Sequence, residues 1–376
     1  GANLSLTNAD FDSANVTAAN GTVTYNDKDG VSIVSADTGS ASTGTVSITT
    51  NVLAVTADNA NAIGETGLTL DGLVQANTVN LIANTGNITQ SVGSVLQANS
   101  LNATTTAANA TQTYGDTDVA NAVLSSNAGD ITLSDADGLN VTATTNSVTT
   151  GVVTVNAYNS APHVADNLSG ETDLNIKGAN SGGTINLNTE GGDITQDLVG
   201  STVAATNFNL TNNNAGGIVN IQDADAANVD IDTDGGGIFY NGTNGYNLTF
   251  DTHSFVSGSA AFISNGAGTS NSGVSGADLV LTGANVAHDA TITAITDNVS
   301  QNVGSTVSLD TLHVSTVENG KSITINDSDA NTVTLNTTAG GNITYGDRDG
   351  VTVTASTGSV VAGTADITTY TGAASD

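Results

Sequence analysis

Short strand-like segments recur behind glycine at nearly even spacing, and this repeat constrains the fold more than any other feature of the chain. The segments Gly-Thr-Val-Thr, Gly-Thr-Val-Ser, Gly-Leu-Thr-Leu and Gly-Asn-Ile-Thr begin at Gly21, Gly44, Gly67 and Gly86, which are 23, 23 and 19 residues apart. Within each segment apolar and polar residues alternate, as in residues 45–48. Alternation with a period of two places one set of side chains inside and the other toward solvent.

A spacing of about 20 residues matches one coil of a β-helix with two or three short strands. The alternative, an antiparallel sandwich, needs turn signals every ~8–12 residues. Aromatic residues make up only 3% of the chain, and the apolar residues are mostly Val, Ala, Ile and Leu, which suit a narrow core between strands. We therefore expect an all-β fold, a single continuous parallel β-solenoid over residues 1–376. About 18 coils spaced by ~4.8 Å would give an elongated rod of roughly 90 Å.

A longer repeat of about 105 residues overlies the coil repeat. The segments Asn-Ile-Thr-Gln, Asp-Ile-Thr-Gln and Asn-Val-Ser-Gln end at Gln90, Gln196 and Gln301, spaced by 106 and 105 residues. A second motif, Thr-Tyr-x-Asp-x-Asp-Gly, occupies residues 24–30 and 344–350. Because similar coils stand near both ends, we expect this chain to be a window of a longer repeat array without terminal caps.

The charge balance excludes several classes of partner. The chain carries 36 acidic and 4 basic residues, for a net charge of −32. Nucleic acids and anionic lipids both require a basic surface, so neither is an expected partner. No apolar run of about 18 residues is present, so we expect no direct membrane insertion. The chain lacks cysteine and methionine, and the missing methionine predicts a processed or excised segment.

Three segments carry a family resemblance. GNITQSVGSVLQANSLNATT (86–105), GDITLSDADGLNVTA (129–143) and GGDITQDLVGSTVAATNFNLTN (191–212) resemble the repeats of filamentous-haemagglutinin-like exoproteins. These are large bacterial surface adhesins that are often exported by two-partner secretion. The resemblance implies a right-handed β-helix, an extracellular or cell-surface location, and a role in adhesion, biofilm or a surface fibre. It implies no catalytic residues.

Asp-x-Asp pairs follow the expected strands at six places. Aspartate bonds its own backbone two residues on, so turn chemistry is the first interpretation. Carboxylates two residues apart, stacked against the turn of the next coil, are alternatively ligands for a structural Ca²⁺. No cofactor is required under the first interpretation. The pairs are Asp27/Asp29, Asp116/Asp118, Asp135/Asp137, Asp223/Asp225, Asp327/Asp329 and Asp347/Asp349.

Aromatic residues concentrate in the stretch 239–262, which holds six of the thirteen Phe and Tyr residues. One interpretation places these rings inside the solenoid. The other is an exposed patch that binds a glycan or a neighbouring molecule, formed by Phe239, Tyr240, Tyr246, Phe250 and Phe255. The segment 158–173 contains the only proline, Pro162, and we expect it to be a loop that leaves the solenoid.

Three function classes are open: a structural fibre, an adhesin that binds a host or matrix glycan or protein through its loops, and a glycan-active enzyme. The aspartate pairs are repeated along the chain, whereas a glycosidase needs one unique pair. The histidines His163, His253, His288 and His313 show no metal-ligand spacing, and Thr-x-Thr pairs are too irregular for ice binding. We therefore expect a non-catalytic structural fibre or stalk module. Its partners would be further copies of itself, joined head to tail or laterally, or flanking repeats of a longer chain.

Overall fold

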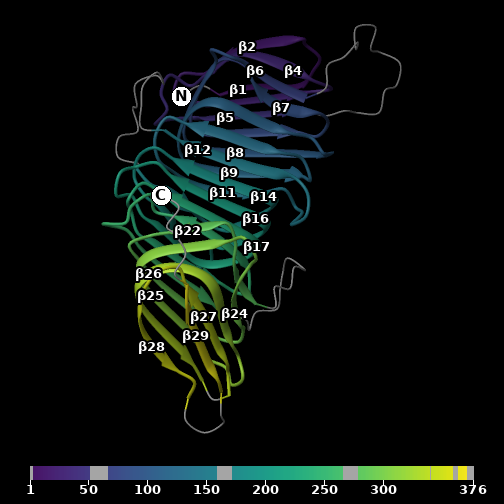
Figure 1. The fold of residues 1–376 in the computed structure, drawn as a ribbon. Helices are drawn as coiled ribbons and strands as arrows, with labels where there is room; N and C mark the ends of the chain where they lie inside the picture. The colour runs from purple at the N-terminus through teal and green to yellow at the C-terminus, as the bar shows by residue number, and fades with distance from the viewer. Residues whose placement is uncertain are drawn as a thin grey trace. The chain divides into compact units, whose positions relative to one another are not determined.

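The fold of the chain was obtained as a computed structural model, which describes residues 3–50, 67–158, 172–265, 278–338, 340–358 and 363–370. The described residues form 29 parallel strands and no helix (Figure 1). The strands belong to about 14 turns of about 22 residues each, so the predicted β-solenoid is confirmed. The described residues make about 14 turns, fewer than the 18 coils expected for the whole chain, because each turn takes about 22 residues and part of the chain lies outside the described residues. Most of the predicted loop at 158–173 lies outside the described residues.

The chain divides into two compact units, residues 1–192 and 193–376, and each is described by itself. The single continuous solenoid over residues 1–376 stays a prediction. The strands of the first unit are β1 (Leu4–Ala9), β2 (Ser13–Thr17), β3 (Thr22–Asp27), β4 (Val31–Asp37), β5 (Thr45–Thr50), β6 (Gly67–Ala83), β7 (Asn87–Gln90), β8 (Val95–Ala108), β9 (Gln112–Asn127), β10 (Ile131–Asp135), β11 (Leu139–Thr144), β12 (Val152–Ala157), β13 (Leu174–Ile176) and β14 (Ala179–Thr189).

The second unit contains the remaining strands. These are β15 (Ile194–Gln196), β16 (Thr202–Asn212), β17 (Val219–Thr233), β18 (Ile238–Gly242), β19 (Asn247–Asp251), β20 (Ser259–Ser264), β21 (Leu279–Leu281), β22 (Ala284–Val286), β23 (Asp289–Ala294), β24 (Val299–Gln301), β25 (Thr306–Thr316), β26 (Ile323–Thr337), β27 (Ile343–Asp347), β28 (Thr352–Ser356) and β29 (Ala365–Thr369).

Parallel register repeats the same interior position from coil to coil. In the first unit Val23 pairs with Val46, Val46 with Val79, Val79 with Leu101, and Leu101 with Ala122. All five side chains are buried. Each interior side chain therefore packs on an apolar neighbour above and below it, which is how a quasi-one-dimensional repeat builds its core.

The second unit has the same construction. One interior column runs through Ala260, Ala290, Leu312, Val333 and Val353 in consecutive coils. The first four are buried. Val353, in β28, is half exposed because no described residue lies over it. The burial of an interior position thus depends on the presence of the next coil.

The aromatic stretch 239–262 packs mainly inside the second unit. Tyr240, Tyr246, Phe250 and Phe262 are at most 1% exposed. The Tyr240 and Tyr246 ring centroids are 5.0 Å apart, and those of Phe250 and Phe262 are 4.7 Å apart, within the range of favourable aromatic pairs. Of the residues in the hypothetical contact patch, Tyr240, Tyr246 and Phe250 therefore do not reach the surface. Phe239 is half-buried.

Candidate functional site

A corner is the place where a coil turns from one strand to the next. Three of the six Asp-x-Asp pairs share one arrangement at such a corner, in which the first aspartate is buried at the end of a strand. Asp135 is the clearest copy. Its Oδ1 accepts the N–H of Asp137 at 3.4 Å, and its Oδ2 accepts the Val119 N–H at 3.0 Å and the Thr117 hydroxyl at 2.7 Å. Thr117 and Val119 belong to the preceding coil, on β9, so one carboxylate joins two coils at a corner.

The same arrangement recurs at Asp27 and Asp347, where a buried tyrosine replaces the threonine. Tyr25 donates to Asp27 at 2.8 Å, and Tyr345 donates to Asp347 at 2.9 Å. A backbone N–H from the preceding coil and that of the second aspartate complete each site. The tyrosine-containing motif thus marks a tied corner.

Burial governs the ionisation of these three carboxyls. Desolvation raises the pKa of Asp27, Asp135 and Asp347 above the usual range, and the hydrogen bonds from N–H and O–H donors oppose this effect. The same burial raises the pKa of Tyr25 and Tyr345. The N–H and O–H groups that these carboxyls accept come from the turn itself and from the preceding coil, which is the pattern of turn chemistry.

The other three Asp-x-Asp pairs are held through their backbones by the repeated glutamines. Gln301 Nε2 donates to the carbonyl oxygens of Ser305 and Asp327, both at 2.8 Å. Its Oε1 accepts the N–H groups of Asn326 at 2.8 Å and Asp327 at 2.9 Å. The buried amide therefore makes all four hydrogen bonds that it commonly supports, and it joins its own turn to the corner of the next coil. We call this arrangement the glutamine clamp.

The glutamine clamp recurs in the two other copies of the long repeat. The amide of Gln90 bonds the backbone of Ser94, Gly115 and Asp116 with donor–acceptor distances of 2.7–3.1 Å. The corresponding bonds of Gln196 go to Ser201, Gln222 and Asp223 at 2.8–3.2 Å. Each copy of the repeat of about 105 residues therefore contains one glutamine clamp.

The clamp and the buried aspartate act on successive coils of the same corner. In the first unit Gln90 holds Asp116, and the neighbouring Thr117 donates to Asp135 of the following coil. In the second unit Gln301 holds Asp327, and the Asp347 carboxylate of the following coil accepts the N–H of Ala330 from the same corner at 3.3 Å. Three coils are thus connected in series by side chains, in addition to the parallel hydrogen bonds of the strands.

The remaining positions of the Asp-x-Asp pairs vary in exposure. Asp118 and Asp225 are buried, and Asn244 donates to Asp225 at 2.9 Å. The half-buried or exposed carboxylates are those of Asp29, Asp116, Asp137, Asp223, Asp327, Asp329 and Asp349. Within the described ranges, none of the twelve aspartates belongs to a group of three His, Asp, Glu or Cys side chains close enough to share an ion. Calcium at these pairs stays a prediction.

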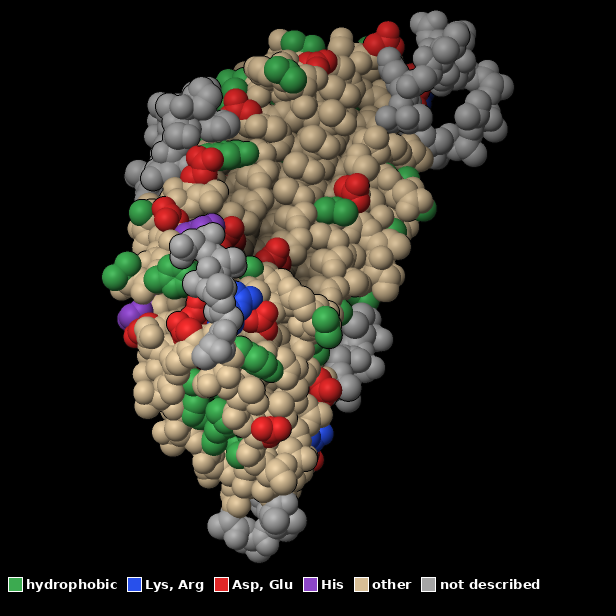
Figure 2. Space-filling model, in the orientation of Figure 1, with side chains coloured by type: hydrophobic (Ala, Val, Ile, Leu, Met, Phe, Trp, Pro, Cys, Tyr) green, Lys and Arg blue, Asp and Glu red, His purple; other side chains and the backbone are tan. Residues whose placement is uncertain are grey.

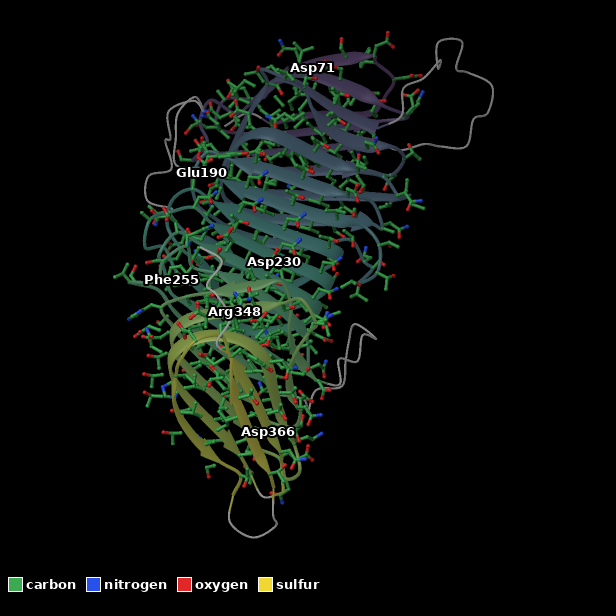
Figure 3. All side chains as sticks on the ribbon, viewed as in Figure 1. Asp71, Glu190, Asp230, Phe255, Arg348 and Asp366 are labelled. Carbon is green, nitrogen blue, oxygen red and sulfur yellow. The ribbon has the colours of Figure 1, made fainter. Side chains whose placement is uncertain are left out.

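The basic side chains between aspartates form ion pairs across coils. Lys28 Nζ lies 3.7 Å from Asp10. Arg348 contacts both carboxylate oxygens of Asp327 through Nε and Nη2, the latter at 2.9 Å (labelled in Figure 3). The Arg348 pair connects the corner held by Gln301 to the corner of Asp347. Exposed pairs of this kind add little stability individually, at most about 1 kcal/mol.

A shallow pocket of about 230 Å³ on the second unit brings an exposed aromatic ring together with several polar side chains. Phe255 is 60% exposed, in the turn between β19 and β20, and lies at the margin of the coils in Figure 3. Ser254 Oγ accepts the N–H groups of Val256 and Ser257 in that turn. Beside the ring, the pocket is lined by Ser308, Leu309, Asp310, Asp329 and Asn331.

The pocket and the surface around it are acidic. Asn331 Nδ2 donates to Asp310 Oδ1 at 2.8 Å. His253, two residues before Phe255, lies 2.9 Å from Asp232 Oδ1. Partial burial lowers the pKa of His253, but Asp232 and Asp251 outweigh this effect and raise it. Figure 2 shows acidic side chains on the visible faces of both units with few Lys or Arg side chains among them. An apolar ring with a few convergent polar groups is the usual make-up of a small-ligand site.

One cluster near this pocket was missed by sequence reasoning. His288, Asp289 and Asp310 offer ligand atoms that lie within 4.8 Å of one another. The spacing of histidines alone did not reveal it, because the ligands come from adjacent coils. The available signal was the coil period, since residues 288 and 310 are one coil of about 22 residues apart.

Comparison with known proteins adds no family assignment. No protein-family model matches the chain, and neither a curated protein nor a solved structure matches it. The fold itself defines the class: the chain is a parallel β-solenoid repeat protein. In the part of the chain that the structure describes, no helix is long and apolar enough to cross a membrane.

Proposed function

We propose that this chain is a non-catalytic scaffold, a stalk or fibre module of a bacterial protein displayed outside the cell. The observation that carries the proposal is the glutamine clamp, which recurs with the same four hydrogen-bonded groups at Gln90, Gln196 and Gln301. A binding or catalytic site is made once, by groups that occur together in one place. A glutamine clamp that occurs three times at regular intervals instead stiffens the whole repeat array.

The interior supports the same role. Apolar columns run from coil to coil, and buried tyrosine–aspartate pairs and glutamine clamps tie the corners. Stability in such arrays is the sum of each coil and its interfaces with its neighbours. Resistance to local opening at the corners is the property that a stalk under tension requires.

The last described coil of the second unit supports association with further coils. The side chains of Val353 and Ile367 lie at interior positions, yet Ile367 is 40% exposed, and Tyr370 is 54% exposed. No described residue pairs with the outer edges of β28 and β29. An open parallel edge with exposed apolar groups is a template for another strand. We propose that further parallel coils continue the ladder, either flanking repeats of a longer chain or a second copy.

A location outside the cell is supported by the resemblance of the repeats to filamentous-haemagglutinin-like exoproteins, and by the net charge of −32, which keeps a long repeat array soluble. Immunogold electron microscopy of unpermeabilised producing cells tests this location and role. We expect label along surface projections, and loss of these projections when the coding segment is deleted. Label that is seen only after permeabilisation would exclude the proposal.

A second candidate function, binding of a glycan, is favoured by the Phe255 pocket. An exposed ring beside the polar side chains of Ser308, Asp310 and Asn331 can stack on a sugar face and bond its hydroxyl groups. A glycan array probed with the wild-type chain and with Phe255→Ala tests it. We expect one class of glycan to bind the wild type and to lose binding in the variant. Equal binding by both proteins, or none by either, would exclude this site.

A further inference from the structure

The cluster of His288, Asp289 and Asp310 is the strongest unassigned feature of the molecule. We propose that it is a binding site for a divalent transition-metal ion of the zinc type, next to the Phe255 pocket. His288 Nε2 lies 4.0 Å from Asp289 Oδ2, and the three ligand atoms are within 4.8 Å of one another. A separation of 4.0 Å is too long for a hydrogen bond, and it exceeds by only about 0.6 Å the ~3.4 Å that separates two ligands of a tetrahedral ion with bonds of ~2.1 Å.

The histidine is oriented for ligation. Its Nδ1 lies 2.8 Å from the carbonyl oxygen of Phe255. A carbonyl oxygen only accepts, so Nδ1 carries the proton, and the lone pair of the neutral ring is on Nε2. A metal-bound histidine commonly donates its other ring N–H to a backbone carbonyl, which sets its tautomer and orientation. The turn that carries Phe255 therefore presents Nε2 of His288 to the two carboxylates.

One carboxylate of the cluster also has an outer partner. Asn331 Nδ2 donates to Asp310 Oδ1 at 2.8 Å, which leaves Oδ2 for an ion. Hydrogen bonding of this type holds ligating carboxylates in position. Both the imidazole and a carboxylate therefore have supporting contacts from residues outside the cluster.

The coil register brings these residues together. Ser259, Asp289, Thr311 and Thr332 pair in sequence across four coils. The turn of Phe255 and the residues His288, Asp310 and Asn331 therefore occupy one corner in successive coils, each just before a paired position. An ion here would connect the turn of Phe255 to the two coils that follow.

The local charge favours a cation. The cluster adds two carboxylates to a corner that also contains Asp329. The basic side chains of the second unit are committed elsewhere, because Lys321 pairs with Glu318 at 3.4 Å and Arg348 with Asp327. Two adjacent carboxylates without a basic neighbour repel each other, and a divalent ion relieves that repulsion.

The ligand set selects the kind of ion. One imidazole and two carboxylates suit Zn²⁺ with bonds of about 2.0–2.2 Å, whereas Ca²⁺ prefers oxygen ligands only. Bonds of that length place tetrahedral ligands ~3.4 Å apart, so ligand atoms that now lie within 4.8 Å of one another must approach by up to about 1.4 Å. The half-exposed side chains of Asp289 and Asp310 have the freedom to do so. Three protein ligands leave a coordination position open, and Asp310 also lines the pocket.

The test is isothermal titration of the chelator-treated chain with ZnCl₂, alongside His288→Gln and Asp310→Asn. We expect one site for the wild type, with affinity reduced at least about 10-fold in both variants. The matched control is His253→Gln, an exposed histidine between carboxylates at 2.9 and 3.7 Å, which should bind as the wild type does. Calcium chloride should give no saturable binding that depends on His288.

A second readout guards against misfolding of a variant. Zinc should raise the unfolding temperature of the wild type and of His253→Gln but not that of His288→Gln, while all three melt alike in chelator. Zinc binding that is unchanged in His288→Gln and Asp310→Asn would overturn the proposal. So would equally weak binding by every variant, because that pattern is adventitious binding to an acidic surface.

Discussion

Replacement of Gln301 by leucine removes one glutamine clamp while keeping a side chain of similar size. The amide makes four hydrogen bonds at 2.8–2.9 Å and is 8% exposed. A net value of about 1 kcal/mol for each bond gives about 4 kcal/mol. Asn326 is exposed, so water replaces part of the loss at its N–H. We expect a destabilisation of the corner by about 3 kcal/mol.

The assay is amide hydrogen exchange at Asn326 and Asp327, because a long repeat array need not unfold in a single two-state step. Exchange reports the local opening of the corner directly. A loss of about 3 kcal/mol corresponds to roughly 100-fold faster exchange, at 1.4 kcal/mol for each factor of ten. Gln301→Glu should be no better than leucine, because its carboxylate faces the carbonyl oxygens of Ser305 and Asp327.

The matched control is Gln75→Leu. The amide of Gln75 donates to the side chain of Gln97 at 2.8 Å on the face of β6, away from a clamp. Its loss should cost about 1 kcal/mol or less and leave exchange at residues 326 and 327 unchanged. Exchange in Gln301→Leu within about threefold of the wild type would show that the clamp does not hold the corner.

Three further predictions concern a buried carboxyl, a buried ring and a closely packed glycine. Burial raises the pKa of Asp135 in the folded state, so its contribution to stability is complete below the unfolded pKa of about 4 and is lost as pH rises through the folded value. The opening free energy of the wild type minus that of Asp135→Asn, measured by amide hydrogen exchange corrected for its intrinsic pH dependence, should therefore decline from pH 4 to pH 7. Parallel profiles would contradict this. Phe262→Ala should cost about 3–5 kcal/mol in the same assay, while the exposed Phe255→Ala should change stability by less than about 0.5 kcal/mol; similar losses would place Phe262 outside the core. Gly44 and Gly39 both have positive φ, of 77° and 85°, but a Cβ at Gly44 would lie 2.5 Å from the Gly21 oxygen, whereas a Cβ at Gly39 would meet open space. Gly44→Ala should therefore destabilise the chain by at least about 2 kcal/mol and Gly39→Ala by about 1 kcal/mol. Equal losses would mean that the close contact at Gly44 does not matter.

The solenoid could be predicted from the sequence because each coil repeats one physical requirement. The positions of Val23, Val46 and Val79 must all be apolar, since each packs on the next. The alternation of apolar and polar residues is therefore visible in the amino-acid sequence. The number of coils was less accurate, because turn residues carry no such constraint and their number varies between coils.

The role of the glutamines could not be predicted from the sequence. The spacing of Gln90, Gln196 and Gln301 was visible, but their partners are N–H and C=O groups of the backbone about 26 residues further on. Every residue has such groups, so no side-chain pattern identifies them. For the same reason the six Asp-x-Asp pairs looked alike, although three are held through their carboxylates and three through their backbones.

The aromatic stretch and the metal cluster depended on different information. Tyr240 lies at an interior strand position and Phe255 in a turn, a distinction that requires strand boundaries. His288 and Asp310 lie close together in the structure, but this proximity can be recognised in the sequence only when the local coil length is known. A glycine spacing that varied from 19 to 23 residues was too coarse to align single side chains across coils.

Single-molecule force spectroscopy tests whether the stacked and clamped coils resist tension as separate units. The whole chain is pulled from its two ends. Turns of about 22 residues at about 3.5 Å for each extended residue should be released in successive steps of about 75 Å or small multiples of that length. Smooth extension without discrete steps would mean that the coils do not resist tension as stacked, clamped units.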